Sequence, residues 1–417
     1  MPTDEANRKL RRHKKSRGGC GNCKLRKIKC DENKPTCERC KIYGTFCNYD
    51  SRYSELQPIS CDTSFLPVLE KQPYSGTQSV LMVLNGRSDL QQSGSAVHPV
   101  GNYTYTPRDI EQIDKLYSRT IFTLPAHQNF KKFQKAYNTL TYAHPFLLHT
   151  AIALTILHDQ YLLSTEDPKL SAAVAFHWAR GAALMNEKLS SKLTSDDRDA
   201  LWCCAGLLGA LSFAAFLGKT PEESWPLSEN SSFDLGWLKM SEGKKAIWKI
   251  ADPQRPDSIF HSTAPDFVAY ASTTSASISY LKNLPSELLQ LCGLHDSILN
   301  VDNPYLASAS FLAEILEIDS GLQSVGRMLC FFGGMHPGLK SLLMRKDPCA
   351  LLLLALWYAK MYECTQCWIW QRTYLEYHAI LKYLRLHYSH ESRIVEVVKV
   401  WERTLLQNSV GNISLFS

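Results

Sequence analysis

The start of the chain lacks the apolar core that a secretory signal peptide requires. It reads MPTDEANRKLRRHKKSRGG, where charged residues stand in place of a hydrophobic run. We therefore expect the chain to remain in a reducing compartment. Its 14 cysteines are then expected to stay as thiols or to bind metal, and not to form a disulfide framework.

Complete catalytic motifs are also missing. The GKT segment at 218–220 resembles the end of a phosphate-binding loop, but Phe213 stands where that loop needs its first glycine. The HE pair at 390–391 starts a metalloprotease-like pattern, whose second histidine is replaced by Ile394, and no G-x-S-x-G elbow is present. The sequence therefore does not predict an enzyme.

Long uncharged runs are rare, and the longest needs an explanation. The segment Ala200–Leu217 contains 18 residues without a charge, which is the threshold length for a membrane span. It lacks flanking aromatic and basic anchors, follows the acidic residues Asp196, Asp197 and Asp199, and is rich in alanine and glycine. We interpret it as a buried helix and expect no membrane span.

Positive charge is concentrated at the beginning of the chain. Residues 1–50 contain 14 Lys and Arg against 6 Asp and Glu, a net +8, and the remainder contains 32 against 34, a net −2, which returns the overall +6. Basic side chains that neutralise phosphates release counterions, so a local excess indicates a nucleic-acid partner. The run RKLRRHKKSR at 8–17 fits a nuclear import signal, an arm along the phosphates, or both.

Six cysteines in this basic segment follow a repeated spacing. The pattern C-x2-C-x6-C-x6-C-x2-C-x6-C is formed by Cys20, Cys23, Cys30, Cys37, Cys40 and Cys47. Because the same spacing occurs twice, it predicts two similar halves, each a short helical turn followed by an extended return. The Lys34-Pro35 pair between them favours a turn.

The number of thiols fits two zinc ions and not one. A C-x2-C pair places two sulfurs on one side of a single turn, and zinc takes four ligands. Two tetrahedral ions need eight metal–sulfur bonds, which six thiolates supply only if two of them bridge both ions. The segment has almost no apolar core, so structural zinc, worth on the order of 10 kcal/mol, is expected to drive its folding.

Residues 19–49 resemble the fungal binuclear zinc cluster transcription factors. The similarity rests on CGNCKLRKIKCD at 20–31 and on the Lys34-Pro35 turn. By this resemblance Cys20 and Cys37, the first cysteine of each pair, are the bridging ligands, and the first helix enters the DNA major groove. The resemblance also implies that Arg26 and Lys27 read a CGG-like or CGA-like triplet.

The chemistry of the basic residues agrees with that implication. Arginine and lysine donate to the O6 and N7 atoms of guanine, and a good contact discriminates by about 1–3 kcal/mol. Lys24 and Lys29 flank the two base-reading candidates and are expected to bind phosphates, as is Arg17 in the basic arm. The second half carries Glu38 among its basic residues and is the weaker candidate for groove entry.

The rest of the chain divides by composition. We assign a basic arm to residues 1–17, the cluster to 18–50, a linker to 51–108 and a helical domain to 109–417. The segment 48–60 has no heptad pattern and contains Pro58, so no coiled coil is predicted, although dimerisation stays open. The apolar patch Ser79–Leu84 within the linker is expected to pack on the following domain.

Helical patterns separated by proline and glycine continue from Thr106 onward, without alternating strands, and predict an all-α domain. The expected helices span Phe146–Leu163, Lys169–Ser190, Ser195–Leu217, Glu242–Ile250, Pro285–Asn300, Ala307–Asp319, Leu322–Phe332, Pro348–Glu363, Ile369–Tyr388 and Ser392–Gln407.

This second region resembles the regulatory domain of the sterol uptake control regulators. The matching marks are HPFLLH at 144–149, the small-residue helix at 200–217, and Asp234-Leu235 followed by Trp237 and Gly243. The resemblance implies a domain that can bind an apolar effector and control nuclear entry. Seven apolar residues are candidates to line such a site, with core packing as the expected role of most: Trp202, Cys203, Phe213, Phe216, Met328, Phe331 and Phe332.

These observations predict a nuclear, sequence-specific regulator of RNA polymerase II genes that binds two zinc ions and double-stranded DNA, with shuttling from the cytoplasm. Its expected setting is a metabolic, sterol or secondary-metabolite pathway, and both activation and repression stay open. The alternative is an effector-binding receptor or interaction protein in which the helical domain dominates and DNA contact is weak.

Overall fold

The computed structural model describes residues 18–25, 28–42, 45, 47–49, 84, 103–123, 130–163, 167–216, 218–228, 235–265, 268, 277–295, 300, 302–318, 327–332, 335–363 and 370–409. The α-helices are α1 Gly21–Leu25, α2 Glu38–Ile42, α4 Pro107–Ser118, α5 Phe130–Ala143, α6 Pro145–Leu163, α7 Pro168–Leu189, α8 Ser195–Ala214, α9 Gly236–Ala251, α11 Ser286–Leu291, α12 Leu306–Ile315, α14 Pro337–Met344, α15 Pro348–Tyr362, α16 Trp370–His387 and α17 Ser392–Ser409. Short 3-10 helices are η2 Thr120–Thr123, η3 Pro221–Glu223, η4 Ser277–Asn283 and η5 Cys330–Phe332.

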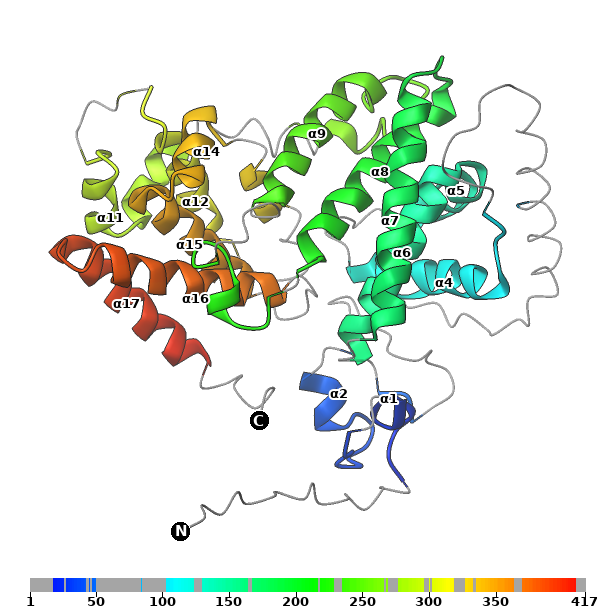
Figure 1. The fold of residues 1–417 in the computed structure, drawn as a ribbon, viewed down its shortest axis with the longest axis horizontal. Coiled ribbons are helices and arrows are strands. Elements are labelled where there is room, and N and C mark those ends of the chain that lie inside the picture. The colour runs from blue at the N-terminus through cyan, green and yellow to red at the C-terminus, as the bar shows by residue number, and fades with distance from the viewer. Residues whose placement is uncertain are drawn as a thin grey trace, which may run out of the picture.

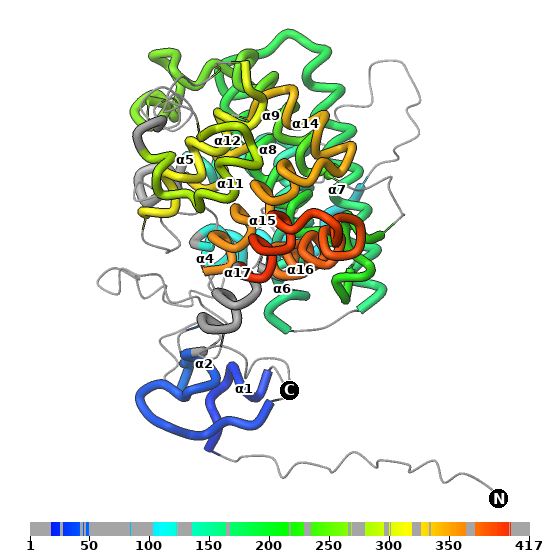
Figure 2. Tube along the Cα trace, turned by 90° about the vertical axis from the view of Figure 1, so that its left-hand side faces the viewer, coloured from blue at the N-terminus to red at the C-terminus, as the bar shows by residue number. Residues whose placement is uncertain are grey.

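A small cluster module is followed by a helical domain, as the sequence predicted. Within the described ranges, all regular elements are helices and no β-strand is formed. Figure 1 shows α1 and α2 below two groups of longer helices, and Figure 2 shows the same module at one end of the molecule. The arm at 1–17 lies outside the described residues, as does the linker at 51–108 apart from residue 84 and 103–108.

Capping boxes start two of the longer helices. Thr106 N donates to Asp109 Oδ2 at 2.8 Å before α4, and Thr194 N donates to Asp197 Oδ2 at 2.9 Å before α8. Each threonine side chain in turn accepts a hydrogen bond from the backbone of its aspartate, so the otherwise free N–H groups at the helix start are satisfied. The sequence predicted α8 but did not delimit α4, α5 or α14.

Several predicted helix boundaries were wrong. The helix expected at Pro285–Asn300 ends at Leu291, because Gly293 takes a φ of 63° in the left-handed region and reverses the chain. The helix expected from Glu242 begins earlier, at Gly236, after Leu235 in the left-handed region. At the end of the helix expected over Leu322–Phe332, η5 is a 3-10 turn, and residues 319–326 lie outside the described part.

The first of two hydrophobic cores is built from α4 to α9. It contains Ile113 of α4, Leu147 and Ile152 of α6 and Leu201 of α8, all fully buried. Leu84, the last residue of the apolar patch in the predicted linker, is also buried in this core. The prediction that this patch packs on the following domain is therefore confirmed for Leu84, the one residue of the patch that the structure describes.

Among the described residues, one helix, α6, is long and apolar enough to cross a membrane. It has 19 residues, and 72% of its most apolar 18-residue stretch is buried inside the fold. It packs against α7 and α8, so its apolar faces are covered by protein. The run singled out in the sequence forms α8 up to Ala214, and its Ala200, Leu201, Cys204 and Leu211 are buried as expected.

The second core is built from α11 to α17 and is rich in aromatic rings. Trp357 of α15 lies at its centre and donates from Nε1 to Met328 O at 2.8 Å. Phe213 from the end of α8 and Trp237 from the start of α9 belong to this second core. Leu201 in the first half of α8 and Ala251 at the end of α9 belong to the first. The packed pair of helices α8 and α9 therefore contributes to both cores.

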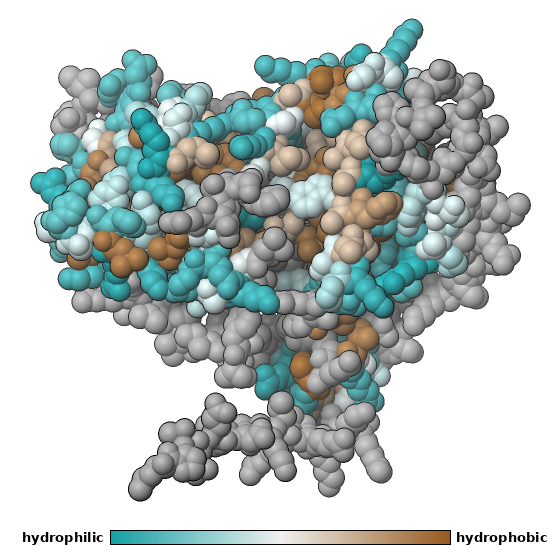
Figure 3. Space-filling model, viewed as in Figure 1, coloured by the Kyte–Doolittle hydropathy of each residue, from teal (hydrophilic) through white to brown (hydrophobic). Residues whose placement is uncertain are grey.

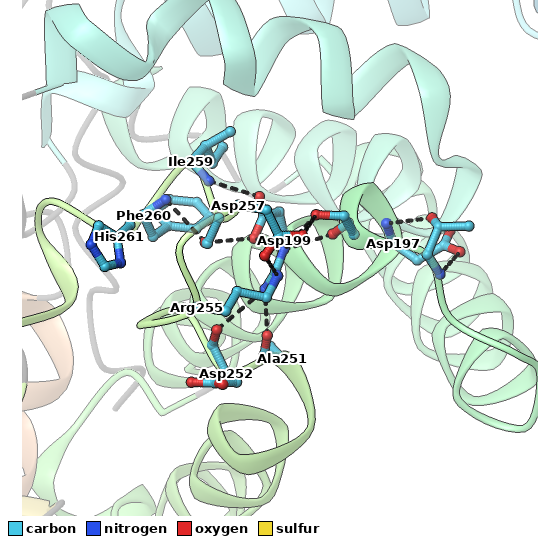
Figure 4. Close-up of polar contacts among 12 residues, drawn as sticks. Asp197, Asp199, Ala251, Asp252, Arg255, Asp257, Ile259, Phe260 and His261 are labelled. Carbon is cyan, nitrogen blue, oxygen red and sulfur yellow. Dashed lines mark hydrogen bonds and ion pairs between the residues drawn. The ribbon is translucent and has the colours of Figure 1, made fainter.

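A buried carboxylate ties α8 to the segment after α9 (Figure 4). Asp199 Oδ1 accepts from Arg255 Nη2 at 2.5 Å and from Ser258 Oγ at 2.7 Å, and its Oδ2 accepts from Ile259 N at 2.9 Å. Arg255 Nη2 also donates to Ser195 O at 2.8 Å. Because the two opposite charges are buried and hydrogen-bonded to each other, this network fixes the position of residues 255–259 on α8.

Exposed apolar side chains are spread over the helical domain. Phe176 of α7, Ile250 of α9 and Leu386 of α16 are examples on three different helices. Figure 3 shows that on one face such residues form separate patches among hydrophilic ones. No single apolar surface therefore identifies a docking face in this view.

Candidate metal centre

The two halves of the cysteine repeat have matching backbone hydrogen bonds. Lys24 N donates to Cys20 O and, 17 residues further on, Lys41 N donates to Cys37 O, both at 3.1 Å. Two further bonds repeat in the same way, from Ile28 N to Cys23 O at 3.1 Å and from Thr45 N to Cys40 O at 3.0 Å. Each half is thus a helical turn that carries one C-x2-C pair, which is the local structure that the spacing predicts.

All six thiols of the repeat converge at the centre of the module. Each of these cysteines is buried, with at most 5% of its surface exposed. The sulfurs form two sets of four in which all members lie within 4.8 Å of one another. One set is Cys20, Cys23, Cys30 and Cys37, and the other is Cys20, Cys37, Cys40 and Cys47. Cys20 and Cys37 belong to both sets.

The sulfur separations fit tetrahedral zinc. A Zn–S bond of about 2.3 Å places two sulfurs of a tetrahedron about 3.8 Å apart. The observed distances are 3.8 Å for Cys20–Cys37, 3.5 Å for Cys20–Cys40 and 3.7 Å for Cys23–Cys37. The donor set therefore suits two zinc ions that share one edge of sulfurs.

Burial explains why several of these thiols need a metal, whereas hydrogen bonds from Tyr49 and from the backbone lower the pKa of Cys30 to about 7. Burial raises the pKa of Cys40 to about 12 and raises the pKa of Cys23 and Cys37 as well. At neutral pH such thiols keep their protons unless a cation compensates the thiolate charge. Zinc binding therefore has to displace protons from this centre.

The end of the module is fastened to the first helix by Asn48. Its Oδ1 accepts from Asn22 N, at the start of α1, at 2.6 Å. A Cβ atom on Gly21 would lie 2.6 Å from Asn48 Nδ2, so a larger residue there would displace the Asn48 side chain. The sequence alone assigned no role to Asn48 or to Tyr49, whose hydroxyl lies 3.1 Å from Cys30 Sγ.

The predicted DNA contacts are only partly within the described residues. Lys24 on α1 and Lys29 after it are both exposed, beside the exposed apolar side chains of Leu25 and Ile28. Arg17, Arg26 and Lys27 lie outside the described part of the chain. On the second half, Lys41 lies 4.0 Å from Glu38, which reduces its local positive charge.

Six of the seven apolar residues considered for an effector site are divided between the two cores. Trp202 and Cys203 are buried in the first core. Phe213, Met328, Phe331 and Phe332 are buried in the second, and Phe216 lies beside Arg372. Aromatic members of the second core pack directly on one another: the ring centroids of Phe331 and Phe332 are 5.3 Å apart. Core packing accounts for these six residues, and Phe216 is half-buried.

Comparisons with known proteins agree with this geometry. Residues 18–55 match the family model described as the fungal Zn(2)-Cys(6) binuclear cluster domain. The chain is 26% identical over 270 residues to the Zn(2)-C6 fungal-type transcription factor afumD of Aspergillus fumigatus, an alignment that covers 63% of this chain and 62% of the relative. The chain thus spans less than two thirds of that relative's length.

Two other relatives match over the cluster alone. A Zn(2)-C6 fungal-type transcription factor of Gibberella zeae is 54% identical over 41 residues, which are 10% of this chain and 8% of that protein. The sterol uptake control protein 2 of Saccharomyces cerevisiae is 51% identical over 37 residues, which are 9% of this chain and 4% of that protein. Residues 18–55 are therefore a fungal Zn(2)-Cys(6) binuclear cluster domain, which binds two zinc ions, on a chain that is related to fungal Zn(2)-C6 transcription factors.

Proposed function

We propose that this chain is a nuclear, sequence-specific DNA-binding transcription regulator. The observation that carries the proposal is the convergence of six buried thiols, in two sets of four, within the most basic segment of the chain. A zinc-folded module with a net charge of +8 over residues 1–50 has the electrostatics of a DNA-binding domain. Two of the relatives named above are transcription factors, and we propose no enzymatic reaction.

All six cysteines of the repeat act as zinc ligands in this proposal, with Cys20 and Cys37 as the bridging pair. The support is that these two sulfurs alone belong to both sets of four. Sharing them gives each ion four sulfurs from six thiolates, which satisfies the tetrahedral preference of zinc. We propose that the cluster ends near residue 50, that the linker follows, and that residues 109–417 form the regulatory domain.

Base reading is assigned to Arg26 and Lys27, and phosphate binding to Lys24, Lys29 and Arg17. Support comes from the exposed positions of Lys24 and Lys29 on either side of the base-reading pair in the sequence. Arginine and lysine recognise guanine edges, so the expected target is a CGG-like or CGA-like triplet. The second half, where Glu38 lies near Lys41, is expected to stabilise the fold and not to read bases.

The helical domain is proposed to regulate this DNA-binding activity. The alignment with the Aspergillus fumigatus protein extends over 270 residues and so reaches well beyond the cluster into the helical region. A metabolic, sterol or secondary-metabolite pathway is the proposed setting, and the similarity to a sterol uptake control protein supports it at the cluster only. Because six of the seven candidate effector residues divide between two cores, their arrangement does not favour the alternative in which effector binding dominates.

Selection of bound duplexes from a random DNA library tests the proposal. The zinc-loaded full chain should enrich a CGG-like or CGA-like triplet, Arg26→Ala and Lys27→Ala should relax that preference, and Lys29→Ala should weaken binding to all sequences alike. Lys192→Ala, an exposed residue after α7, serves as the matched control and should change neither. If the zinc-loaded chain shows no preference among the duplexes, the proposal is wrong.

A further inference from the structure

Backbone N–H groups donate to the cluster sulfurs in a pattern that follows the internal repeat. Cys23 N donates to Cys20 Sγ at 3.4 Å, and Cys40 N donates to Cys37 Sγ at 3.3 Å. The last cysteine of each half also accepts from the backbone: Glu32 N donates to Cys30 and Cys37 N donates to Cys47, both at 3.4 Å. Backbone N–H groups therefore support thiols in both halves.

One side chain breaks this symmetry. The hydroxyl of Tyr49 lies 3.1 Å from Cys30 Sγ. Cys47 is the counterpart of Cys30 in the second half, and it accepts no hydroxyl hydrogen bond among the described residues. A zinc-bound thiolate has no proton to give, so in the loaded cluster Tyr49 must be the donor and Cys30 the acceptor.

The surroundings of Tyr49 suit that role. Its ring is partly buried against the cysteine core, and Lys34 Nζ lies 5.6 Å from the ring centroid. Two Zn²⁺ ions and six thiolates leave an excess of negative charge on the cluster, so donors and cations near a sulfur stabilise it. Asn48, the neighbour of Tyr49, is held by Asn22 N, which positions the tyrosine over the first half.

We propose that the Tyr49 hydroxyl holds the Cys30 thiolate on the zinc ion of the Cys20, Cys23, Cys30 and Cys37 set, and so makes the two zinc sites chemically different. Tyr49 is a positioning residue, because it acts through Cys30 and does not bind the metal. The inference rests on the ligand set of the proposed function. Cys30 directly follows the segment 26–29 in sequence, so its retention also anchors the end of the proposed base-reading segment.

Cadmium NMR of the full chain distinguishes the two sites. The wild-type chain loaded with ¹¹³Cd²⁺ should show two tetrathiolate resonances. Tyr49→Phe keeps the ring and removes only the hydroxyl, so it should shift one resonance and leave the other in place. Loss of a hydrogen bond to a metal ligand commonly weakens metal binding by about 10-fold or more, so in chelator competition one of the two zinc ions should leave about 10-fold more readily.

The possible outcomes test the ligand set, the Tyr49 hydrogen bond and the difference between the two zinc sites separately. Tyr280→Phe, at an exposed tyrosine of the helical domain, is the matched control and should leave both resonances and both zinc affinities unchanged. If the wild-type chain binds fewer than two cadmium ions, the ligand set itself is wrong. If two ions bind and Tyr49→Phe behaves as wild type, the hydrogen bond has no role, and if both resonances and both affinities change alike, the proposed difference between the sites is refuted.

Discussion

Arg372 Nε donates a 2.6 Å hydrogen bond to the carbonyl oxygen of Phe213. Phe213 lies in the last turn of α8 and Arg372 in the first turn of α16, so this bond joins α8, which contributes to both cores, to the second core. The guanidinium also lies 5.3 Å from the Phe213 ring centroid and 5.0 Å from that of Phe216. A positive charge at the carbonyl end of a helix is favourable, because the unpaired C=O groups there are partly negative.

Removing this arginine should destabilise the helical domain. Arg372 Nη1 donates to Glu376 Oε1 at 2.8 Å, and Tyr358 donates its hydroxyl to the same carboxylate, with all three side chains buried. Arg372→Ala would leave the Glu376 charge uncompensated, at a cost of about 3–5 kcal/mol in the free energy of unfolding. Urea unfolding followed by circular dichroism measures the change. Arg393→Ala, on the exposed side of α17, should stay within about 0.5 kcal/mol of wild type, and equal effects of the two substitutions would contradict the argument.

Buried histidines should make the helical domain sensitive to acid. His149 Nδ1 and His177 Nδ1 are 2.8 Å apart, and burial lowers the pKa of His149 to about 3 and lowers that of His177. In the unfolded chain a histidine titrates near about 6.5, so between these values only the unfolded state binds the proton. The free energy of unfolding is therefore highest above about pH 6.5. It decreases as the pH falls below this value, by up to about 1.4 kcal/mol per pH unit for each histidine.

The slope of unfolding free energy against pH measures this effect. His149→Asn should reduce the slope between about pH 6 and 4.5, because one group with a lowered pKa is gone. His390→Asn is the control, since that side chain is 73% exposed, and its slope should match wild type. A His149→Asn slope as steep as that of wild type would show that His149 does not carry the acid sensitivity.

Gly21 and Gly243 should respond oppositely to alanine. At Gly21 a Cβ would meet Asn48 Nδ2 at 2.6 Å, so Asn48 must move and release Asn22 N. Losing that bond costs about 1 kcal/mol, or about fivefold in zinc affinity measured by chelator competition. A Cβ on Gly243 in α9 would meet no atom within 4 Å, so Gly243→Ala should raise helix stability by about 0.5–1 kcal/mol and leave zinc affinity unchanged. Equal zinc affinities for the two variants would contradict the role given to Gly21.

Zinc removal should separate the two parts of the chain. A chelator should extract two zinc ions per chain and abolish DNA binding, because the cluster has almost no apolar core besides its cysteines and Tyr49. The far-ultraviolet circular dichroism should change little, since α4 to α17 carry none of the proposed ligands. Zinc quantification, circular dichroism and DNA binding on the same sample check this. A parallel collapse of the helical signal would mean that the two parts fold together.

The sequence predicted features that depend on spacing and missed those that depend on tertiary contact. The repeated cysteine spacing was sufficient to anticipate two matching turns, because ligand geometry constrains the chain locally. The run at 200–217 was recognisable as a buried helix from its composition. By contrast, the end of α11 depends on the left-handed Gly293, and the contact of Tyr49 with Cys30 joins residues that no pattern links. Arg372 likewise resembles any helix-surface arginine until its burial is known.

The packing of α8 and α9 limits where the polypeptide can be cut or terminated. The segment 215–235 between the two helices looks like a natural boundary in the sequence, yet Phe213 before it and Trp237 after it are both buried in the second core. A nonsense mutation or a protease cut there would leave Phe213 exposed at the end of the first fragment. After a protease cut, the second fragment would also contain a cavity where Phe213 had packed. Premature termination soon after α8 should therefore give an aggregation-prone product and not a shortened regulator.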